Sequence, residues 1–157
     1  MIIINSSESL YAFAIGEAVD IGKVKDEVFA SKTLGDGIAV KPTEGVLYSP
    51  CNASVATVAD TSHAVTLTSE SGAEILLHVG IDTVELKGAF FSMHARRGQK
   101  VKAGDKLISF QKDKVEYTGY DSTICMTICN SDEFRINKLT KDGSSVDKND
   151  VVITLER

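Results

Sequence analysis

Short apolar clusters rich in β-branched residues recur along the chain, and each is closed by a turn signal within about 8 to 15 residues. Glycine and aspartate mark most of the boundaries, as in Gly35-Asp36-Gly37 and Asp142-Gly143. Many short strands separated by such turns are typical of all-β sandwiches and barrels. The sequence therefore predicts an all-β protein. The expected strands span residues 17–21, 37–42, 45–50, 54–58, 63–68, 73–79, 106–110, 122–129 and 151–155.

Little helix is expected beside these strands. Residues 23–35, KVKDEVFASKTLG, could form one or two turns, and residues 131–139, SDEFRINKL, one more. Neither segment has the long apolar stripe of a stable amphipathic helix. No linker, low-complexity tract or charge block divides the 157 residues, so we expect a single domain over residues 1–157.

The charge balance argues against two classes of partner. The net charge is −5 at pH 7, whereas nucleic acids and anionic membrane surfaces favour clustered Lys and Arg. The apolar start, residues 1–4, is too short for the hydrophobic region of a signal peptide. No run approaches the roughly 18 apolar residues of a membrane span. We therefore expect a cytoplasmic protein without nucleic-acid partners and without direct membrane insertion.

The cysteines follow no ligand or disulfide pattern. There are three, Cys51, Cys125 and Cys129, and none forms a CxxC pair. Cys125 and Cys129 lie four residues apart in a predicted strand, where they would share a face at about 13 Å, too far for a disulfide or one zinc ion. Buried, reduced thiols are expected.

Two of the three histidines bracket one predicted hairpin, HAVTLTSESGAEILLHV, residues 63–79. A two-residue or four-residue loop around Glu70-Ser71 would place His63 directly opposite His78, with Cβ atoms about 4.5–5.5 Å apart. A three-residue loop ending at a left-handed Gly72 would instead stagger the two by one residue. A single histidine on an apolar face is usually a core residue, but two facing each other indicate a site.

Facing imidazoles suit two kinds of chemistry. Two histidines alone fill only half of a tetrahedral zinc site. In phosphoryl transfer, one neutral ring attacks phosphorus while the other donates hydrogen bonds to the charged oxygens. Histidine suits this task because its unperturbed pKa near 6.5 leaves a neutral ring at physiological pH. The pair therefore favours phosphoryl transfer, with no metal and no cofactor.

The segment HVGIDTVELKG, residues 78–88, with DTSHA upstream at residues 60–64, resembles the glucose-type enzyme IIA domain of the bacterial phosphoenolpyruvate:sugar phosphotransferase system. The similarity extends from about Ala14 to Leu155. It includes GDGIAVKPTEG (35–45), VFASKTLGDG (28–37) and GQKVKAGDKLISF (98–110). The resemblance implies an antiparallel β-sandwich, or barrel-sandwich, of the duplicated hybrid motif type.

The resemblance also implies a phosphotransferase component with a phosphohistidine intermediate. Such a phosphocarrier takes a phosphoryl group from phospho-HPr and passes it to a cysteine on a sugar-specific IIB domain, which couples sugar uptake to phosphorylation. His78 would accept the phosphoryl group on Nε2, with Nδ1–H held by a backbone carbonyl. His63 would stabilise the phosphate, Thr61 would orient His63, and Asp82 would lie at the edge of the site. The apolar surface that receives the partner proteins would contain Phe29, Ile38, Leu76, Val79 and Val84.

Two other classes share parts of these motifs. The His78-x-x-x-Asp82 pair and the region after His94 are similar to zinc endopeptidases that act on cell walls, but those enzymes need a downstream His-x-His, and no histidine follows His94. KVKAGDKL and Lys114 are similar to biotinyl or lipoyl carrier modules. In those modules, however, the modified lysine precedes the glycine-containing segment, whereas Lys114 follows it. The resemblance assigns His94 no role.

Overall fold

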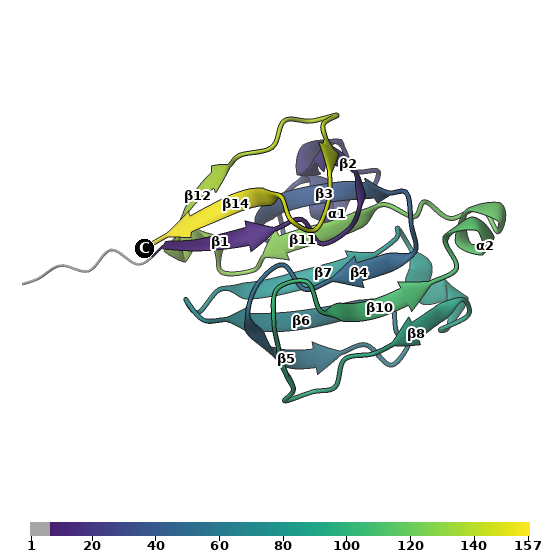
Figure 1. Cartoon of the computed structure of the whole chain (residues 1–157). Coiled ribbons are helices and arrows are strands. Elements are labelled where there is room, and N and C mark those ends of the chain that lie inside the picture. Colours follow the sequence, from purple (N-terminus) through teal and green to yellow (C-terminus); the bar gives the residue numbers. More distant parts are fainter. Residues whose placement is uncertain (1–6) are drawn as a thin grey trace, which may run out of the picture.

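The computed structural model describes residues 7–157, which form three antiparallel sheets (Figure 1). The large sheet has eight strands in the order β13-β2-β3-β11-β7-β6-β5-β9, and two small sheets have the orders β1-β14-β12 and β4-β10-β8. The strands are β1 (Ser7–Tyr11), β2 (Gly16–Asp20), β3 (Asp36–Pro42), β4 (Val46–Tyr48), β5 (Ala53–Val58), β6 (Ala64–Ser69), β7 (Glu74–Val79), β8 (Phe91–Met93), β9 (Lys100–Val101), β10 (Lys106–Phe110), β11 (Ile124–Ile128), β12 (Arg135–Lys138), β13 (Ser145–Val146) and β14 (Val151–Glu156).

Helical segments are short. The α-helices are α1 (Glu27–Ala30) and α2 (Lys112–Tyr117), and the 3₁₀ turns are η1 (Ile21–Lys23), η2 (Thr83–Leu86) and η3 (Ser131–Glu133). Asp26 caps α1 by accepting a hydrogen bond from Val28 N at 2.9 Å. No helix among residues 7–157 has the length and apolar character needed to cross a membrane. The predicted all-β class with little helix is confirmed.

Figure 1 shows the two small sheets lying over one face of the large sheet. The space between them holds the main core, to which all three sheets contribute, with Leu10 from β1, Leu77 from β7 and Leu107 from β10 fully buried. Burial of each such side chain contributes about 1.5–3 kcal/mol. The predicted sandwich architecture is therefore confirmed, and its packed face is the inner face of the large sheet.

The outer face of the large sheet carries a second, smaller apolar cluster. Strand alternation sends Ile124, Met126 and Ile128 of β11 inward to the main core and Cys125 outward. We call this second group the outer cluster. It consists of Ile21, Val24, Phe29, Ala39, Ile81 and Cys125. The outer cluster anchors α1 and η1 on the sheet, and it lies beside the histidines.

The hairpin between β6 and β7 has the staggered register. Thr68 pairs with Glu74, and Ser69 N donates to Ala73 O at 2.9 Å, which leaves a three-residue loop ending at Gly72. Gly72 has a φ of +88°, a conformation that glycine adopts without strain. His78 therefore pairs with Ala64. Direct pairing of His63 with His78, which two of the three possible loops would give, is wrong.

Smaller expectations were met in part. The helical turn expected in residues 131–139 is present as η3, and β12, which was not expected, follows it at the edge of a small sheet. The α2 helix and the short strands β1, β8, β9 and β13 were not expected. All three cysteines are free, as expected, but only Cys51 and Cys125 are buried, because Cys129 lies beyond the end of β11 and is exposed.

Candidate functional site

His78 lies on the outer face of β7, in a regular part of the large sheet. Its neighbours across the two adjacent strands are Ala64 on β6 and Cys125 on β11. The Nδ1–H group of His78 donates to the carbonyl oxygen of Gly80 at 2.8 Å. A carbonyl oxygen only accepts, so this bond requires a proton on Nδ1. In the neutral ring, Nε2 is therefore left with a free lone pair.

The surroundings of His78 keep its ring neutral. Phe29 packs against the ring with centroids 5.2 Å apart. Burial lowers the pKa of His78, while the hydrogen bond to Gly80 and the charges of Asp26 and Asp82 oppose that shift only in part. Because the net direction is downward from 6.5, the neutral, nucleophilic form predominates at neutral pH.

His63 lies in the tight loop between β5 and β6, just before β6 begins at Ala64. Ser62 N donates to Ala59 O at 2.9 Å, and Ser62 has a left-handed φ of 59°. Regular strand alternation would place His63 on the inner face with Val65, but the turn interrupts that alternation. The backbone of His63 remains attached to β7, because Val79 N donates to His63 O at 2.8 Å.

This turn brings the two imidazoles into contact. The ring centroids of His63 and His78 are 4.8 Å apart, and the rings meet edge to face at 81°. The staggered register and the irregular turn thus produce the proximity that a direct cross-strand pair would have given.

Thr61 supports the second histidine. Its hydroxyl forms a hydrogen bond with Nδ1 of His63 at 2.6 Å. His63 is buried, with 7% of its surface exposed. Burial, and secondarily the neighbouring His78, lower the pKa of His63 to about 4, so this ring is also neutral near pH 7.

The remaining residues expected at the site divide between the two faces of the sheet. Asp82 is exposed and has a left-handed φ of 60° just before η2. Val84 on η2 is 51% exposed, and Leu76 is half-buried against the outer cluster. Ile38 and Val79 instead point into the main core. Their place in a docking surface is therefore corrected, because strand alternation turns both side chains away from the histidine face.

Three residues with evident roles in this geometry were not singled out from the sequence. Gly80 supplies the carbonyl that binds His78, Ser62 redirects the chain before His63, and Asp26 adds negative charge near His78. Asp26 carried a usable signal, since aspartate directly ahead of segment 27–30, EVFA, is a preferred helix N-cap. The roles of Gly80 and Ser62 depend on backbone conformation and carried no comparable signal.

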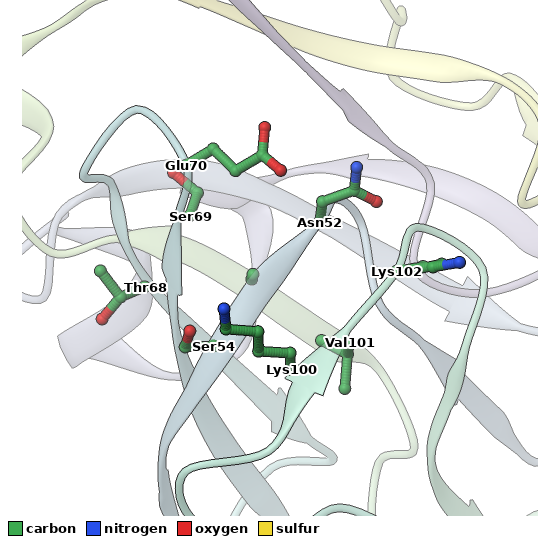
Figure 2. A pocket seen from close by; sticks show the side chains of 9 residues that line it. Asn52, Ser54, Thr68, Ser69, Glu70, Lys100, Val101 and Lys102 are labelled. Atoms are coloured by element: carbon green, nitrogen blue, oxygen red, sulfur yellow. The ribbon is translucent and has the colours of Figure 1, made fainter.

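A separate hollow of about 440 Å³ lies at the other end of β6, near the hairpin loop. Figure 2 shows polar residues around it, with Glu70 from the hairpin, Lys100 from β9 and Asn52 before β5. Neither histidine lines it, and Ser69 lies six positions after His63, about 20 Å along a strand. Within residues 7–157, no group of three or more His, Cys, Asp or Glu side chains is arranged to hold a metal ion.

Fold and site together define an antiparallel β-sandwich domain with a pair of contacting, neutral histidines on one face. The family model for the phosphoenolpyruvate-dependent sugar phosphotransferase system, EIIA 1, matches residues 8–134. The chain belongs to this family, and the resemblance expected from the sequence is confirmed.

Relatives and a solved structure agree with this placement. The chain is 44% identical over 128 residues to the beta-glucoside-specific EIIBCA component of Dickeya chrysanthemi, covering 82% of the chain and 20% of that protein. It is 40% identical over 138 residues to the glucose-specific EIICBA component of Streptococcus pneumoniae, covering 88% and 19%. The glucose permease IIA from Mycoplasma capricolum superposes with a TM-score of 0.82 at 32% identity, covering 98% of this chain and 99% of that one. The chain spans about a fifth of the length of the two multi-component relatives.

Proposed function

We propose that this domain is a phosphocarrier in which His78 accepts a phosphoryl group from phospho-HPr and donates it to a sugar-specific IIB domain. The observation that carries the proposal is the bond from His78 Nδ1–H to Gly80 O, which leaves Nε2 unprotonated beside the ring of His63. The family membership supports HPr and a IIB domain as the two partners.

The first step exchanges one phosphorus–nitrogen bond for another. The lone pair of His78 Nε2 attacks phosphorus, a new P–N bond forms, and the P–N bond to the donor histidine breaks with its electron pair returning to the donor ring. Positive charge develops on the His78 ring during attack. The Gly80 carbonyl and the carboxylates of Asp26 and Asp82 stabilise that charge, because all three favour the protonated form of this ring.

The second step reverses the role of His78. A cysteine thiolate of the IIB domain attacks phosphorus, a P–S bond forms, and the P–N bond to Nε2 breaks. His78 then returns to its neutral form with the proton still on Nδ1. The apolar floor formed by Phe29 and the outer cluster slows attack by water on the phosphohistidine between the two steps.

His63 acts on the phosphoryl oxygens. When the Thr61 hydroxyl donates to His63 Nδ1, the single proton of the neutral His63 ring lies on Nε2. That N–H group can donate to an oxygen of the phosphoryl group as negative charge accumulates there. Thr61 is thus the residue that fixes the tautomer of His63.

The surface around the pair suits transient docking. Val28 and Val84 are 45% and 51% exposed on the segments adjoining the site, and Leu76 is half-buried on the same face as His78. Asp26 and Asp82 add negative charge close to His78. A small apolar patch with acidic neighbours favours fast, reversible association with a partner that carries a basic face.

The test is labelling with phosphoenolpyruvate, enzyme I and HPr. We expect one phosphoryl group per chain on a histidine, lost in acid and retained in base. Addition of a cognate IIB domain should then remove the label. A label that survives acid would assign the acceptor to Ser or Thr and contradict the proposal, as would a chain that phospho-HPr leaves unlabelled.

A further inference from the structure

Hydrogen bonds fix the orientation of the two peptide units that follow His78 on their N–H side and on their carbonyl side. The peptide unit between Val79 and Gly80 is fixed twice, because Val79 O accepts from the Thr83 hydroxyl and Gly80 N donates to Thr123 O at 2.9 Å. The next unit, between Gly80 and Ile81, is fixed in the same way. Its N–H donates to Asp121 O at 2.9 Å, and its carbonyl oxygen accepts from His78. The Gly80 carbonyl oxygen, which accepts from His78, therefore belongs to a peptide unit whose orientation is fixed by hydrogen bonds. We call the backbone from Val79 to Ile81, with the groups of Thr83, Asp121 and Thr123 that bind it, the clamp.

Gly80 fits into this clamp only because it lacks a side chain. Its φ is +82°, and a Cβ atom at this position would lie 2.3 Å from Thr83 Cγ2 and 3.0 Å from Asp121 O. Thr83 is fully buried, so its methyl and hydroxyl groups both have fixed positions. Close packing on this side prevents the Gly80 peptide from rotating away from the histidine.

The other side of the clamp is a second rigid turn. Asp121 Oδ1 accepts from Thr123 N at 2.9 Å and from Thr123 Oγ1 at 2.6 Å. These bonds hold together the two carbonyl oxygens, those of Asp121 and Thr123, that receive the N–H groups of Ile81 and Gly80. Thr83 thus holds the first of the two peptide units through Val79 O, and the turn at Asp121 holds the N–H groups of both units.

We propose that Thr83 and Asp121 are positioning residues that select the Nδ1–H tautomer of His78. Neither side chain needs to contact the phosphoryl group. They aim the Gly80 carbonyl at Nδ1, and the hydrogen bond made by one ring nitrogen determines which nitrogen carries the proton. The tautomer assignment depends only on the structure, while its consequence for phosphoryl transfer rests on the proposed function.

The matched substitutions are Thr83→Val, Thr83→Ser and, as control, Thr127→Val. Valine keeps the shape of threonine but removes the hydroxyl, and serine keeps the hydroxyl. Thr127 on β11 is also fully buried, and its hydroxyl makes no hydrogen bond to the backbone from Val79 to Ile81, so the same change there removes a buried hydroxyl without touching the clamp.

The readout is the ¹⁵N spectrum of the His78 imidazole in the unphosphorylated protein, followed by the rate of labelling by phospho-HPr. Thr83→Val should populate the Nε2–H tautomer and slow labelling by roughly tenfold. This is less than the ~10⁴-fold loss in serine proteases when the triad aspartate is changed to asparagine and the histidine adopts the wrong tautomer. Thr83→Ser and Thr127→Val should match the unsubstituted protein in both measurements.

Asp121→Ala tests the clamp from its other side and carries the test if Thr83→Val does not fold. It should shift the tautomer in the same direction. A folded Thr83→Val or Asp121→Ala variant that retains only the Nδ1–H form overturns the inference. If the tautomer shifts as expected but the unsubstituted protein takes no label, the clamp stands and the proposed function fails.

Discussion

His78 and His63 reach the same place on the protein by different routes. His78 lies within a regular strand, and register with β6 and β11 on either side fixes its backbone. His63 lies in a turn outside the ladder, where a left-handed Ser62 and one backbone bond to Val79 hold it. The proposed acceptor is thus placed by the sheet as a whole, and the proposed stabilising residue by a local loop.

The difference has a mechanical consequence. Moving His78 requires the disruption of a central strand, whereas His63 can shift with changes in a few turn residues. A group that must present one atom in a fixed direction benefits from the stiffer support, and a group that follows phosphoryl oxygens tolerates the softer one. The two supports can be separated by substitution.

The largest effect is expected from His78→Ala. Because this change removes the attacking nitrogen, labelling by phospho-HPr should be lost completely. His94→Ala is the matched control, since His94 is exposed and its Nε2 bonds to Ser109 Oγ away from the pair. Normal labelling of the His78→Ala protein would show that another residue accepts the phosphoryl group.

His63→Gln should separate the two steps. Glutamine keeps a donor group, so we expect labelling of His78 to proceed within about tenfold of the normal rate. Transfer onward to a IIB domain should fall by about 10²-fold, because the donor is no longer a ring fixed by Thr61. The measurement is the rate of label loss on mixing with IIB. Unchanged onward transfer would remove His63 from the mechanism.

Ser62→Val tests the turn alone. A β-branched residue at φ 59° should lower the free energy of unfolding by about 1–2 kcal/mol and slow onward transfer while labelling of His78 persists. Ser62→Gly accepts the same backbone conformation and should change stability by roughly 0.5 kcal/mol or less. Denaturant titration of the two variants checks this contrast, and equal stability of the pair would show that the turn is not strained.

A pH dependence of stability is also expected. His63 has a pKa of about 4 in the folded protein and about 6.5 when unfolded. Between these values the unfolded chain binds the extra proton, so stability is complete above about pH 6.5 and falls as pH decreases toward 4. Denaturant titrations at pH 7 and pH 4.5 should show this loss. His63→Gln should show a smaller one, and an identical loss in both proteins would contradict the low pKa.

Strand positions could be predicted well because each segment shows its own β-branched apolar residues and its own turn signals. All nine expected strands overlap observed ones. The length of the loop in residues 69–73 was harder to predict, since loops of two, three and four residues all fit Ser69-Glu70-Ser71-Gly72. The difference of one residue decides which side chains face each other. Gly72 was the signal for the three-residue loop, but the sequence did not show that it would outweigh the alternatives.

The residues expected to contact partner proteins show a similar limit. Leu76 and Val84 lie on the outer surface, whereas Ile38 and Val79 belong to the main core. All four are ordinary apolar residues within or next to predicted strands or turns. For Val79, strand alternation alone excludes the face of His78, whereas the face of Ile38 follows only from the pairing of β3 with β11.

The sequence by itself determined the sandwich class, the family and the two histidines proposed as the site, because alternation, turn residues and a specific motif are local properties of the chain. The tertiary structure decided how the imidazoles meet, which nitrogen of His78 is free and which apolar residues lie on the outer face beside them. Those features depend on strand register, on left-handed turns and on backbone bonds between residues distant in sequence, such as Gly80 with Thr123. Such bonds form only when the chain folds into its tertiary structure.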